Sequence, residues 1–529
     1  MKIKGILLFT AIIVLLTLNS FAVAPIQSNG GVVTSAEEFV AALGGNYAAY
    51  NEDNIIILKS DVTLKAPIII KSGEYVIRGA GCYIYNGNNN EALFIVEGAD
   101  TKLILGNDKG SDNHPSLSLF GDGNKGNAVI VRNGNVDIYQ GTLISGFESD
   151  YGAGIRVDNG TVNMYGGVIE NCASSKSGGA VYMNNGEFTV YRGLINYCKS
   201  DEKGGAVAID GGTFFLALCP LSYNEAQYGG AIYINSGEFY STGSQIDYNK
   251  AIDGGAVYIN DGTFYFLGGF IVYNEAENNG GGIFNNNNGT FAMDNSYNMP
   301  MIYNTAKNGA AVYNNGTFEF QNGDMTYNTA SECAGAIYNT GTVKMTGGLV
   351  NMNESEGRCG GVMNIGKFVM SNGSISSNKS ASTAKGMENW GELYLAGTCF
   401  ISFNNDVIIG NRAKVEIVAP LTHLTATTPV ATFTPVWCDE GYESMNHKTD
   451  YEIGRSIITG EAEVLLQASE KLAVTSGKDG TWSIDGEGKL QFTKNPFDFK
   501  IIIIIVVIII IIILAIIILP RKNKKTQKV

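Results

Sequence analysis

The sequence predicts an all-β protein: a right-handed parallel β-helix with a short N-terminal capping helix, a β-rich C-terminal cap and one C-terminal transmembrane helix. Two repeating patterns lead to the β-helix. Ten turn glycines recur, nearly always 25 to 27 residues apart: Gly160, Gly186, Gly212, Gly237, Gly262, Gly289, Gly316, Gly341, Gly366 and Gly391. An asparagine recurs in step, at Asn224, Asn249, Asn274, Asn304, Asn328, Asn353, Asn378 and Asn404. Such a period is typical of a solenoid, whose units bury their apolar faces only against their neighbours.

One repeat, residues 254–276, shows the chemistry of short strands. Val257 and Ile259 alternate with Tyr258, which is the period-2 pattern of strands rather than of helices. The positions of Val257 and Ile259 stay apolar in the earlier repeats, so we expect both to face the core. The position of Tyr258 varies in type, so we expect it to face outward.

The second and third strands of the repeat follow the same logic. A column of phenylalanines is predicted to stack inside the rod: Phe188, Phe214, Phe239, Phe264, Phe291, Phe318 and Phe368. Isoleucines precede the recurring asparagine by three residues, at Ile246, Ile271, Ile375 and Ile401. Three strands and three turns fit one coil of a parallel β-helix. The recurring asparagine is expected to bond the backbone or the adjacent amide at a bend, the alternative being a ligand-binding role.

Residues 1–22 are predicted to be a secretory signal peptide. Lys2 and Lys4 precede an apolar run that ends in small residues, which is the layout of such a peptide. An uncleaved membrane anchor is the alternative, although the apolar run is short for a bilayer.

Residues 23–60 are expected to form an N-terminal cap. Ser35 followed by Glu38 is typical of a capping box and opens a short helix. The apolar Phe39, Val40 and Leu43 of this helix suit a lid over the first coil, because an open solenoid end exposes core and unpaired strand edges.

The β-helix itself is predicted over residues 61–418, where the repeat stops. Residues 419–499 are expected to form a β-rich cap and membrane-proximal stalk, a small separate domain being the alternative. Residues 500–519 are predicted to be a transmembrane helix, since Ile501–Leu519 is unbroken apolar sequence that spans about 28 Å as a helix. Residues 520–529 form a basic tail that the positive-inside rule places in the cytoplasm, with the rod outside the cell.

This layout predicts a single-pass protein of the plasma membrane whose N-terminus is outside. A cell-wall sorting signal has a similar hydrophobic and basic end, but the preceding residues 495–498 read Asn-Pro-Phe-Asp rather than its usual motif. The lipid bilayer is therefore one expected partner, through Ile501–Leu519.

Net charge limits the other partners. Without Lys2, Lys4, Lys500 and the five basic residues of the tail, 28 basic residues stand against 50 acidic ones, a formal charge of −22 for the rest. An acidic rod without a basic stripe repels nucleic acid, so no nucleic-acid partner is expected. The pattern does not set the oligomeric state.

Eight cysteines in a secreted chain raise the question of disulfides. Cys172 and Cys198 fall on the asparagine column one coil apart, and Cys333 and Cys359 are also one coil apart. Each pair is within disulfide reach on neighbouring coils, and buried free thiols are the equal alternative. No cysteine–histidine spacing typical of zinc is found, and neither a metal nor a cofactor is expected.

Catalysis is not expected. Parallel β-helices also serve as scaffolds for polysaccharide lyases and glycoside hydrolases, which remain the alternative function. The chain has only three histidines, His114, His423 and His447. Asp158, Asp210 and Asp261 recur near one turn, where acidic residues usually serve turn geometry.

The repeat resembles that of a known family. Gly-Gly-Ala followed by Val or Ile begins at Gly178, Gly204, Gly229 and Gly254. It resembles the GGA[ILV] motif of the chlamydial polymorphic membrane proteins, and Ile246–Asn249 is similar to the FxxN motif of that family. The resemblance covers residues 126–405 and implies a surface β-helix that acts as an adhesin or antigen. A single helix at the C-terminus replaces the autotransporter barrel of the family.

The leading hypothesis is therefore a cell-surface adhesin or antigen that binds a protein or glycan on a host or neighbouring cell. Tyr182, Tyr233, Tyr258 and Tyr313 share the outward column and are the predicted ligand-binding residues, because tyrosine offers flat apolar area with a polar tip. The alternative is that their rings stack across coils and stabilise the sheet. A passive surface coat or spacer is a third function.

Overall fold

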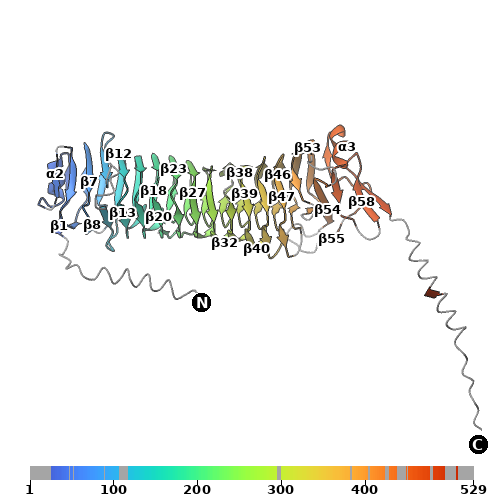
Figure 1. The fold of residues 1–529 in the computed structure, drawn as a ribbon, viewed down its shortest axis with the longest axis horizontal. Helices are drawn as coiled ribbons and strands as arrows, with labels where there is room; N and C mark the ends of the chain where they lie inside the picture. The colour runs from blue at the N-terminus through green and yellow to red at the C-terminus, as the bar shows by residue number, and fades with distance from the viewer. Residues whose placement is uncertain are drawn as a thin grey trace, which may run out of the picture.

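The computed structural model describes residues 26–494, except 47, 52, 88–89, 107–116, 295–299, 382–383, 403–405, 423–427, 438–447, 450 and 477–479, together with Ile508 and Ile509. The described residues from 26 to 494 form a long rod, a right-handed-type parallel β-solenoid of about 14 turns (Figure 1). The predicted β-helix is confirmed. The predicted signal peptide and cytoplasmic tail, and the predicted membrane helix apart from Ile508 and Ile509, lie outside the described residues. Within the described part of the chain, no helix is both long and apolar enough to cross a bilayer.

Each coil contains a first, a second and a third strand in chain order, and most central coils add a short edge strand. The first strands pair coil to coil in parallel: β2 (Gly31–Val33), β6 (Ile68–Ile70), β9 (Phe94–Val96), β12 (Val129–Ile138), β15 (Ile155–Met164), β18 (Val181–Met183), β22 (Val207–Ile209), β25 (Ile232–Ile234), β29 (Val257–Ile259), β33 (Ile283–Asn285), β37 (Val312–Asn314), β41 (Ile337–Asn339), β45 (Val362–Asn364), β49 (Met387–Asn389), β52 (Val407–Ile409), β54 (Ala431–Trp437) and β57 (Leu472–Val474). β12 and β15 continue through the turn into the second strand, which joins both series into one sheet.

The second strands also pair in parallel: β4 (Ile55–Leu58), β7 (Glu74–Arg78), β10 (Lys102–Leu105), β19 (Glu187–Val190), β23 (Thr213–Ala217), β26 (Glu238–Thr242), β30 (Thr263–Phe266), β34 (Thr290–Asp294), β38 (Thr317–Asn322), β42 (Thr342–Met345), β46 (Lys367–Met370), β50 (Glu392–Gly397), β53 (Lys414–Leu421) and β56 (Thr459–Gly460). β3 (Ala48–Tyr50) pairs antiparallel with β4 at the N-terminal end.

The third strands form a separate parallel sheet: β1 (Ile26–Ser28), β5 (Val62–Leu64), β8 (Tyr83–Asn86), β11 (Leu117–Phe120), β13 (Thr142–Ser145), β16 (Val168–Glu170), β20 (Leu194–Asn196), β24 (Leu221–Ser222), β27 (Ser244–Asp247), β31 (Gly269–Val272), β35 (Met301–Ile302), β39 (Asp324–Thr326), β43 (Leu349–Asn351), β47 (Ser374–Ser376) and β51 (Phe400–Ile401). The edge strands follow the bend after the third strand: β14 (Glu148–Tyr151), β17 (Ala173–Ser177), β21 (Lys199–Ser200), β28 (Lys250–Asp253), β32 (Glu275–Asn279), β36 (Thr305–Asn308), β40 (Thr329–Cys333), β44 (Glu354–Ser355) and β48 (Lys379–Ser380).

The core lies inside the coils, where the sequence predicts it. Val257 and Ile259 are fully buried, and so is every member of the phenylalanine column. Phe188 and Phe214 stack with ring centroids 4.9 Å apart, and Phe291 and Phe318 with centroids 4.7 Å apart. The isoleucine column before the asparagines is buried as well. These inward columns are therefore confirmed.

The recurring asparagines form the predicted ladder of buried amides. Asn249 donates from its side chain to the Asn274 side-chain oxygen at 3.0 Å, and from its backbone N–H to the same oxygen at 3.0 Å. Its amide also donates to the Leu221 carbonyl at 2.9 Å. The same bonds repeat from Asn224 to Asn378, and Asn404 lies outside the described residues. Each amide therefore satisfies backbone groups at the bend, as the structural interpretation requires.

A second asparagine ladder went unnoticed in the sequence. Where earlier coils hold the buried Ile259 position, the later coils hold Asn285, Asn314, Asn339, Asn364 and Asn389. Their side-chain amides bond one another at 2.6–2.8 Å. The sequence does contain a signal for this second ladder, because four of its five asparagines precede a turn glycine by two residues.

The repeat glycines have a backbone role. Gly178, Gly204, Gly229 and Gly254 all have φ between 61° and 67°, a region that residues with a side chain rarely adopt. A Cβ at Gly204 would lie 2.2 Å from the Val207 carbonyl oxygen. The first glycine of the motif is thus needed where the edge segment turns into the next first strand.

Both ends of the rod are covered. Helix α2 (Ala36–Ala42) begins at Ser35, whose hydroxyl accepts a bond from the Glu38 backbone N–H at 3.2 Å. Its Phe39 is fully buried 5.3 Å from the Tyr75 ring, so this helix is the expected lid. At the other end, β54 and β57 extend the first-strand series, followed by the hairpin of β58 (Gly480–Ile484) and β59 (Leu490–Lys494). A helix, α3 (Ala462–Ser469), packs against β53 at this end, and the short β55 (Lys448–Thr449) pairs antiparallel with β54 (Figure 1).

Candidate functional site: an exposed tyrosine ladder beside a charge ladder

The structure buries much of the tyrosine column that the sequence predicts as the ligand-binding surface. Tyr182 and Tyr233 are only 7% and 5% exposed, and Tyr258 and Tyr313 are partly buried. The expectation that this column faces solvent is therefore wrong for Tyr182 and Tyr233. The rings do stack across coils, with centroids 5.4 Å apart between Tyr233 and Tyr258.

The edge segment explains this burial. Tyr151 and Tyr228, which directly precede the glycine turn, pack against the column from outside. The Tyr182 hydroxyl donates to Asp210 at 2.6 Å, and burial together with this bond raises the pKa of Tyr182. These contacts match the alternative interpretation of the column as a stabilising stack.

A different set of tyrosines is exposed. Six residues in successive coils stand directly before the position of the buried asparagine ladder and are 41–54% exposed: Tyr197, Tyr223, Tyr248, Tyr273, Tyr303 and Tyr327. Neighbouring rings stack with centroids 4.9–5.4 Å apart and planes within 19° of parallel. We call this row the tyrosine ladder. The repeated Tyr-Asn pair, as in Tyr223-Asn224, was the sequence signal for it.

The backbone of the tyrosine ladder is unfavourable for tyrosine. All six residues have φ between 51° and 58°, the left-handed region in which residues other than glycine and asparagine cost about 1–2 kcal/mol each. The same bend holds Gly146 and Asn171 in the two preceding coils, as that cost favours, and Met352 and Ser377 in the two following coils, both with φ of 54°. Exposed ring stacking contributes about 0.5–1.5 kcal/mol per pair. Stacking and the backbone cost are therefore of the same order, and stability alone gives no reason to prefer tyrosine to glycine or asparagine here.

Stacking also decides what the tyrosine ladder presents to solvent. Each ring face is covered by the next ring, so the surface consists of ring edges and hydroxyl groups. The row suits a partner that meets an edge-on aromatic strip, rather than one that inserts between ring faces.

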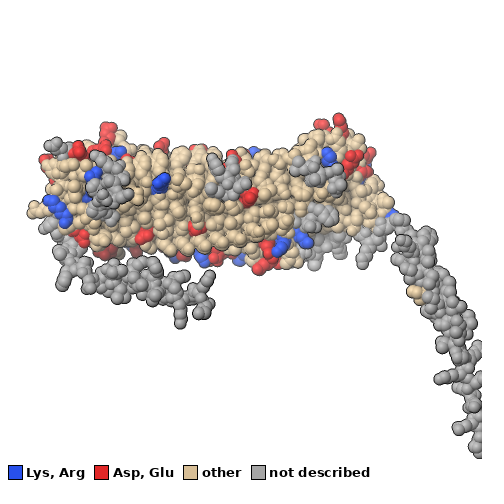
Figure 2. All heavy atoms as spheres, in the orientation of Figure 1, with Lys and Arg blue, Asp and Glu red and all other residues tan. Residues whose placement is uncertain are grey.

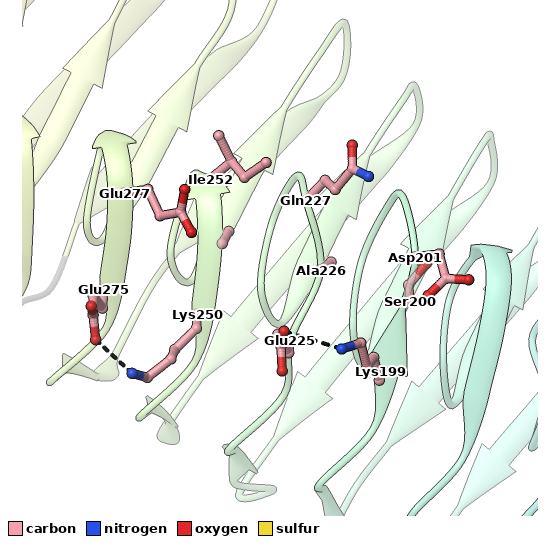
Figure 3. A pocket seen from close by; sticks show the side chains of 11 residues that line it. Lys199, Ser200, Asp201, Glu225, Ala226, Gln227, Lys250, Ile252, Glu275 and Glu277 are labelled. Atoms are coloured by element: carbon pink, nitrogen blue, oxygen red, sulfur yellow. Dashed lines mark hydrogen bonds and ion pairs between the residues drawn. The ribbon is translucent and has the colours of Figure 1, made fainter.

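A row of charges lies beside the tyrosine ladder. Lys199, Glu225, Lys250 and Glu275 align coil by coil, and each follows its ladder tyrosine by two residues. The Lys199 ammonium lies 3.2 Å from Glu225, and that of Lys250 lies 2.8 Å from Glu275 (Figure 3). The bond to Glu275 and its charge raise the pKa of Lys250. We call this row the charge ladder.

The charge ladder lines an open groove of about 520 Å³. Figure 3 shows a second row above it, formed by Asp201, Gln227, Ile252 and Glu277. In the view of Figure 2 the flank of the rod is mostly uncharged, and acidic and basic side chains gather along the lower edge, where Figure 1 places β32 and β40. The edge strands thus carry a concentrated strip of charge.

A second exposed stack has an ordinary explanation. Phe215, Tyr240 and Tyr265 stack on the outer face of β23, β26 and β30, with centroids 4.7 and 4.5 Å apart. Phe215 and Tyr240, together with Leu267, border an apolar hollow of about 410 Å³. Burial and a bond to Glu238 raise the pKa of Tyr240 to about 12. Aromatic side chains pair favourably across strands in ordinary extended backbone, so sheet packing accounts for this stack.

The aspartates considered for catalysis serve structural contacts. Asp158 accepts from Arg156 at 2.6 Å, and Asp210 accepts from Tyr182. Asp261 is exposed on a turn. The three histidines, His114, His423 and His447, lie outside the described residues. In the described part of the chain, no group of three or more His, Cys, Asp or Glu side chains could hold a metal ion.

The four cysteines of the predicted disulfides are free thiols in the structure. Cys198 takes the place of an asparagine in the ladder, since its backbone N–H donates to the Asn224 side chain at 3.0 Å. Burial, and then the neighbouring Cys172 thiol, hold the pKa of Cys198 well above its usual value. Cys333 and Cys359 share one buried cluster, where burial raises the pKa of Cys333 to about 12.

Alkylation tests the state of these thiols. We expect Cys172 and Cys198, each 1% exposed, to react with iodoacetamide more than about tenfold more slowly than the partly exposed Cys82 in the folded protein, because the reagent cannot reach a buried sulfur. In denaturant without reductant all three should react, as mass spectrometry of the peptides would report. If Cys172 and Cys198 react only after reduction, the two are joined by a disulfide.

A scan against protein-family models finds no match for this chain, and searches of curated proteins and of solved structures find no similar protein. The fold and the two ladders are therefore the basis for any functional conclusion.

Proposed function

We propose that this chain is a membrane-anchored cell-surface rod that binds a protein or glycan on a host or neighbouring cell without catalysis, as an adhesin or antigen does. The observation that carries the proposal is the tyrosine ladder. Six exposed tyrosines occupy a bend whose left-handed backbone favours glycine or asparagine, and their stacking is only of the same order as that cost. Strain that stability does not explain is typical of a functional surface.

The layout of the chain supports the orientation. The predicted signal peptide precedes the rod, and the predicted membrane helix follows it, next to the end that carries β58 and β59. A rod anchored in this way holds its α2 end away from the membrane and its tyrosine ladder along its side. The Gly-Gly-Ala repeat resembles that of the chlamydial polymorphic membrane proteins, which supports a surface adhesin of similar architecture.

Regular spacing suits adhesion between surfaces. Each coil presents the same weak contact, so a partner that meets several coils gains avidity without any single strong site. Tyrosine is favoured at such contacts, because it loses little side-chain freedom and has both apolar area and a hydroxyl group.

A triple substitution tests the proposal. Replacing Tyr223, Tyr248 and Tyr273 with asparagine should weaken binding of protein-bearing vesicles to target cells or to a glycan array by at least about tenfold, a loss of 1.4 kcal/mol or more. The free energy of unfolding should change by no more than about 1 kcal/mol, because relief of the left-handed backbone offsets the lost stacking. Binding assays and urea denaturation of the same preparations measure the two effects.

The matched control is Tyr165→Asn. Tyr165 is also exposed and stacked, 4.9 Å from Tyr191, but it lies at the end of β15, away from the bend. The Tyr165→Asn substitution should leave binding unchanged. Full binding by the triple variant, combined with a stability loss of several kcal/mol, would assign the tyrosine ladder to the scaffold and end the proposal.

A further inference from the structure

We infer that the partner of the tyrosine and charge ladders is a second copy of this chain, bound antiparallel, so that two rods anchored in opposed membranes pair side by side. This deepens the proposed function and rests on it for the membrane anchoring. The inference starts from the order of charges along the rod.

The charge ladder is a bounded block that alternates in sign. Lys199, Glu225, Lys250 and Glu275 read plus, minus, plus, minus along successive coils. The same column holds Ala173 before the block and Thr305 after it. The block is therefore locally neutral on a chain whose predicted outer part carries a net charge of −22.

An alternating block of four has a consequence for self-pairing. When a second copy runs antiparallel about the centre of the block, Lys199 faces Glu275 of the other copy, and Glu225 faces its Lys250. All four contacts join opposite charges. When the second copy runs parallel in the same register, every residue faces its own like charge, which costs several kcal/mol across an interface.

The match extends beyond the block. The same reversal sets Ala173 against Thr305, Glu148 against Thr329 and Lys125 against Glu354, according to the register of the edge strands. No like charges meet over this column from Lys125 to Glu354. Charge complementarity of this kind selects one orientation of a partner over another.

Symmetry places the tyrosine ladder in the same contact. A closed pair of identical chains is related by a two-fold axis, and both copies use the same patch. When that axis crosses the rods, each strip faces its own counterpart, so the tyrosines meet tyrosines while the charge ladders meet each other. Tyr197 then faces Tyr273 of the other copy, and Tyr223 faces Tyr248. A two-fold axis parallel to the rods would instead bring like charges together if it ran along the charge ladder, and would set tyrosines against charges if it ran between the two strips.

The edge-on tyrosine ladder fits such a partner. Its ring faces are covered by stacking, so it offers a flat strip of edges and hydroxyls with a spacing of about one coil. Another copy presents the same strip with the same spacing. Asp201 and Glu277, which would carry like charge across the pair, belong to the second row of Figure 3, separate from the charge ladder. A contact of this width is small, so we expect weak pairing that becomes firm only between membranes bearing many copies.

Two charge permutations test the inference on the full chain. K250E/E275K changes the order to plus, minus, minus, plus, which faces like charges in all four antiparallel contacts. E225K/K250E changes the order to plus, plus, minus, minus, which keeps all four contacts opposite. Both variants have the composition and net charge of the parent protein. Within one rod, K250E/E275K keeps opposite charges at the two ion pairs 199/225 and 250/275, whereas E225K/K250E places like charges at both. If the substitutions destabilised the fold through these pairs, E225K/K250E would therefore be the variant affected.

The full chain is reconstituted into two populations of uncharged lipid vesicles, each with its own fluorophore, and their mutual clustering is measured in 0.15 M salt. Parent and E225K/K250E vesicles should cluster, and K250E/E275K vesicles should need at least about tenfold more protein for the same clustering. If K250E/E275K vesicles cluster as well as parent vesicles, or if both variants lose clustering to the same extent, antiparallel pairing is overturned. If parent vesicles bind cells or glycans but not each other, this inference fails and the proposed function stands; if they bind neither, both fail.

Discussion

Replacing Asn274 with leucine is expected to lower the free energy of unfolding by about 3–5 kcal/mol, because several buried polar groups lose their partners at about 1–3 kcal/mol each. The Asn274 oxygen accepts from both the backbone and the side chain of Asn249 at 3.0 Å. Its amide donates to the Ile246 carbonyl at 2.9 Å and to Asn304 at 3.0 Å. Leucine has the same number of side-chain heavy atoms and the same branching but can make none of these bonds.

Urea denaturation followed by circular dichroism measures this loss. Hydrogen exchange should also show lost protection near the bends of Asn249 and Asn304, because a solenoid transmits stability mainly between neighbouring coils. The matched control is Asn185→Leu, since the Asn185 amide bonds Asn159 at 3.4 Å on the exposed surface. It should change stability by less than about 0.5 kcal/mol. Equal effects of the two substitutions would contradict a stabilising role for the buried ladder.

The second large effect is expected at the buried ion pair of Arg358 and Glu388. The two side chains are 8% and 0% exposed, and the guanidinium lies 2.5 Å from the carboxylate. Glu388 also accepts from the Trp390 indole at 3.2 Å. We expect Glu388→Leu to lower the free energy of unfolding by about 3–5 kcal/mol, because it leaves the arginine charge buried without its carboxylate.

A double substitution separates the pair from its surroundings. Arg358→Met with Glu388→Leu should recover most of the loss, since apolar replacement of a whole buried pair is often neutral. The control is Glu319→Leu, which breaks the exposed pair with Lys344 at 3.2 Å and should cost less than about 1 kcal/mol. Thermal melts of the four proteins measure these differences. A double variant less stable than Glu388→Leu would show that the charges stabilise the rod beyond neutralising each other.

Much of the fold was predictable because its signals are periodic and local. Val257, Phe264 and Asn274 repeat at the same phase in many coils, and a residue that repeats in every coil meets its own counterparts above and below. Inward columns and ladders follow from that geometry alone. The second asparagine ladder, from Asn285 to Asn389, was missed because it replaces an apolar column part-way along the rod.

The candidate site was predicted less well. Tyr182 and Tyr233 alternate correctly with the core residues, but the alternation separates only the two sides of a strand. The exposed Tyr223 and Tyr248 stand beside the asparagines, where the bend interrupts the strand pattern. Their left-handed backbone is not visible in the sequence, because that region favours glycine and asparagine over tyrosine.

The sequence by itself determined the period, the inward columns and the amide ladder, because each depends on contacts between equivalent residues of adjacent coils. Only the tertiary structure decided which outward column meets solvent. The edge segment returns over the first strands, and its Tyr151 and Tyr228 cover the column of Tyr182 and Tyr233. Such a contact joins different positions of the repeat, so no periodicity reports it. At the bend no segment returns, and the tyrosine ladder stays exposed there.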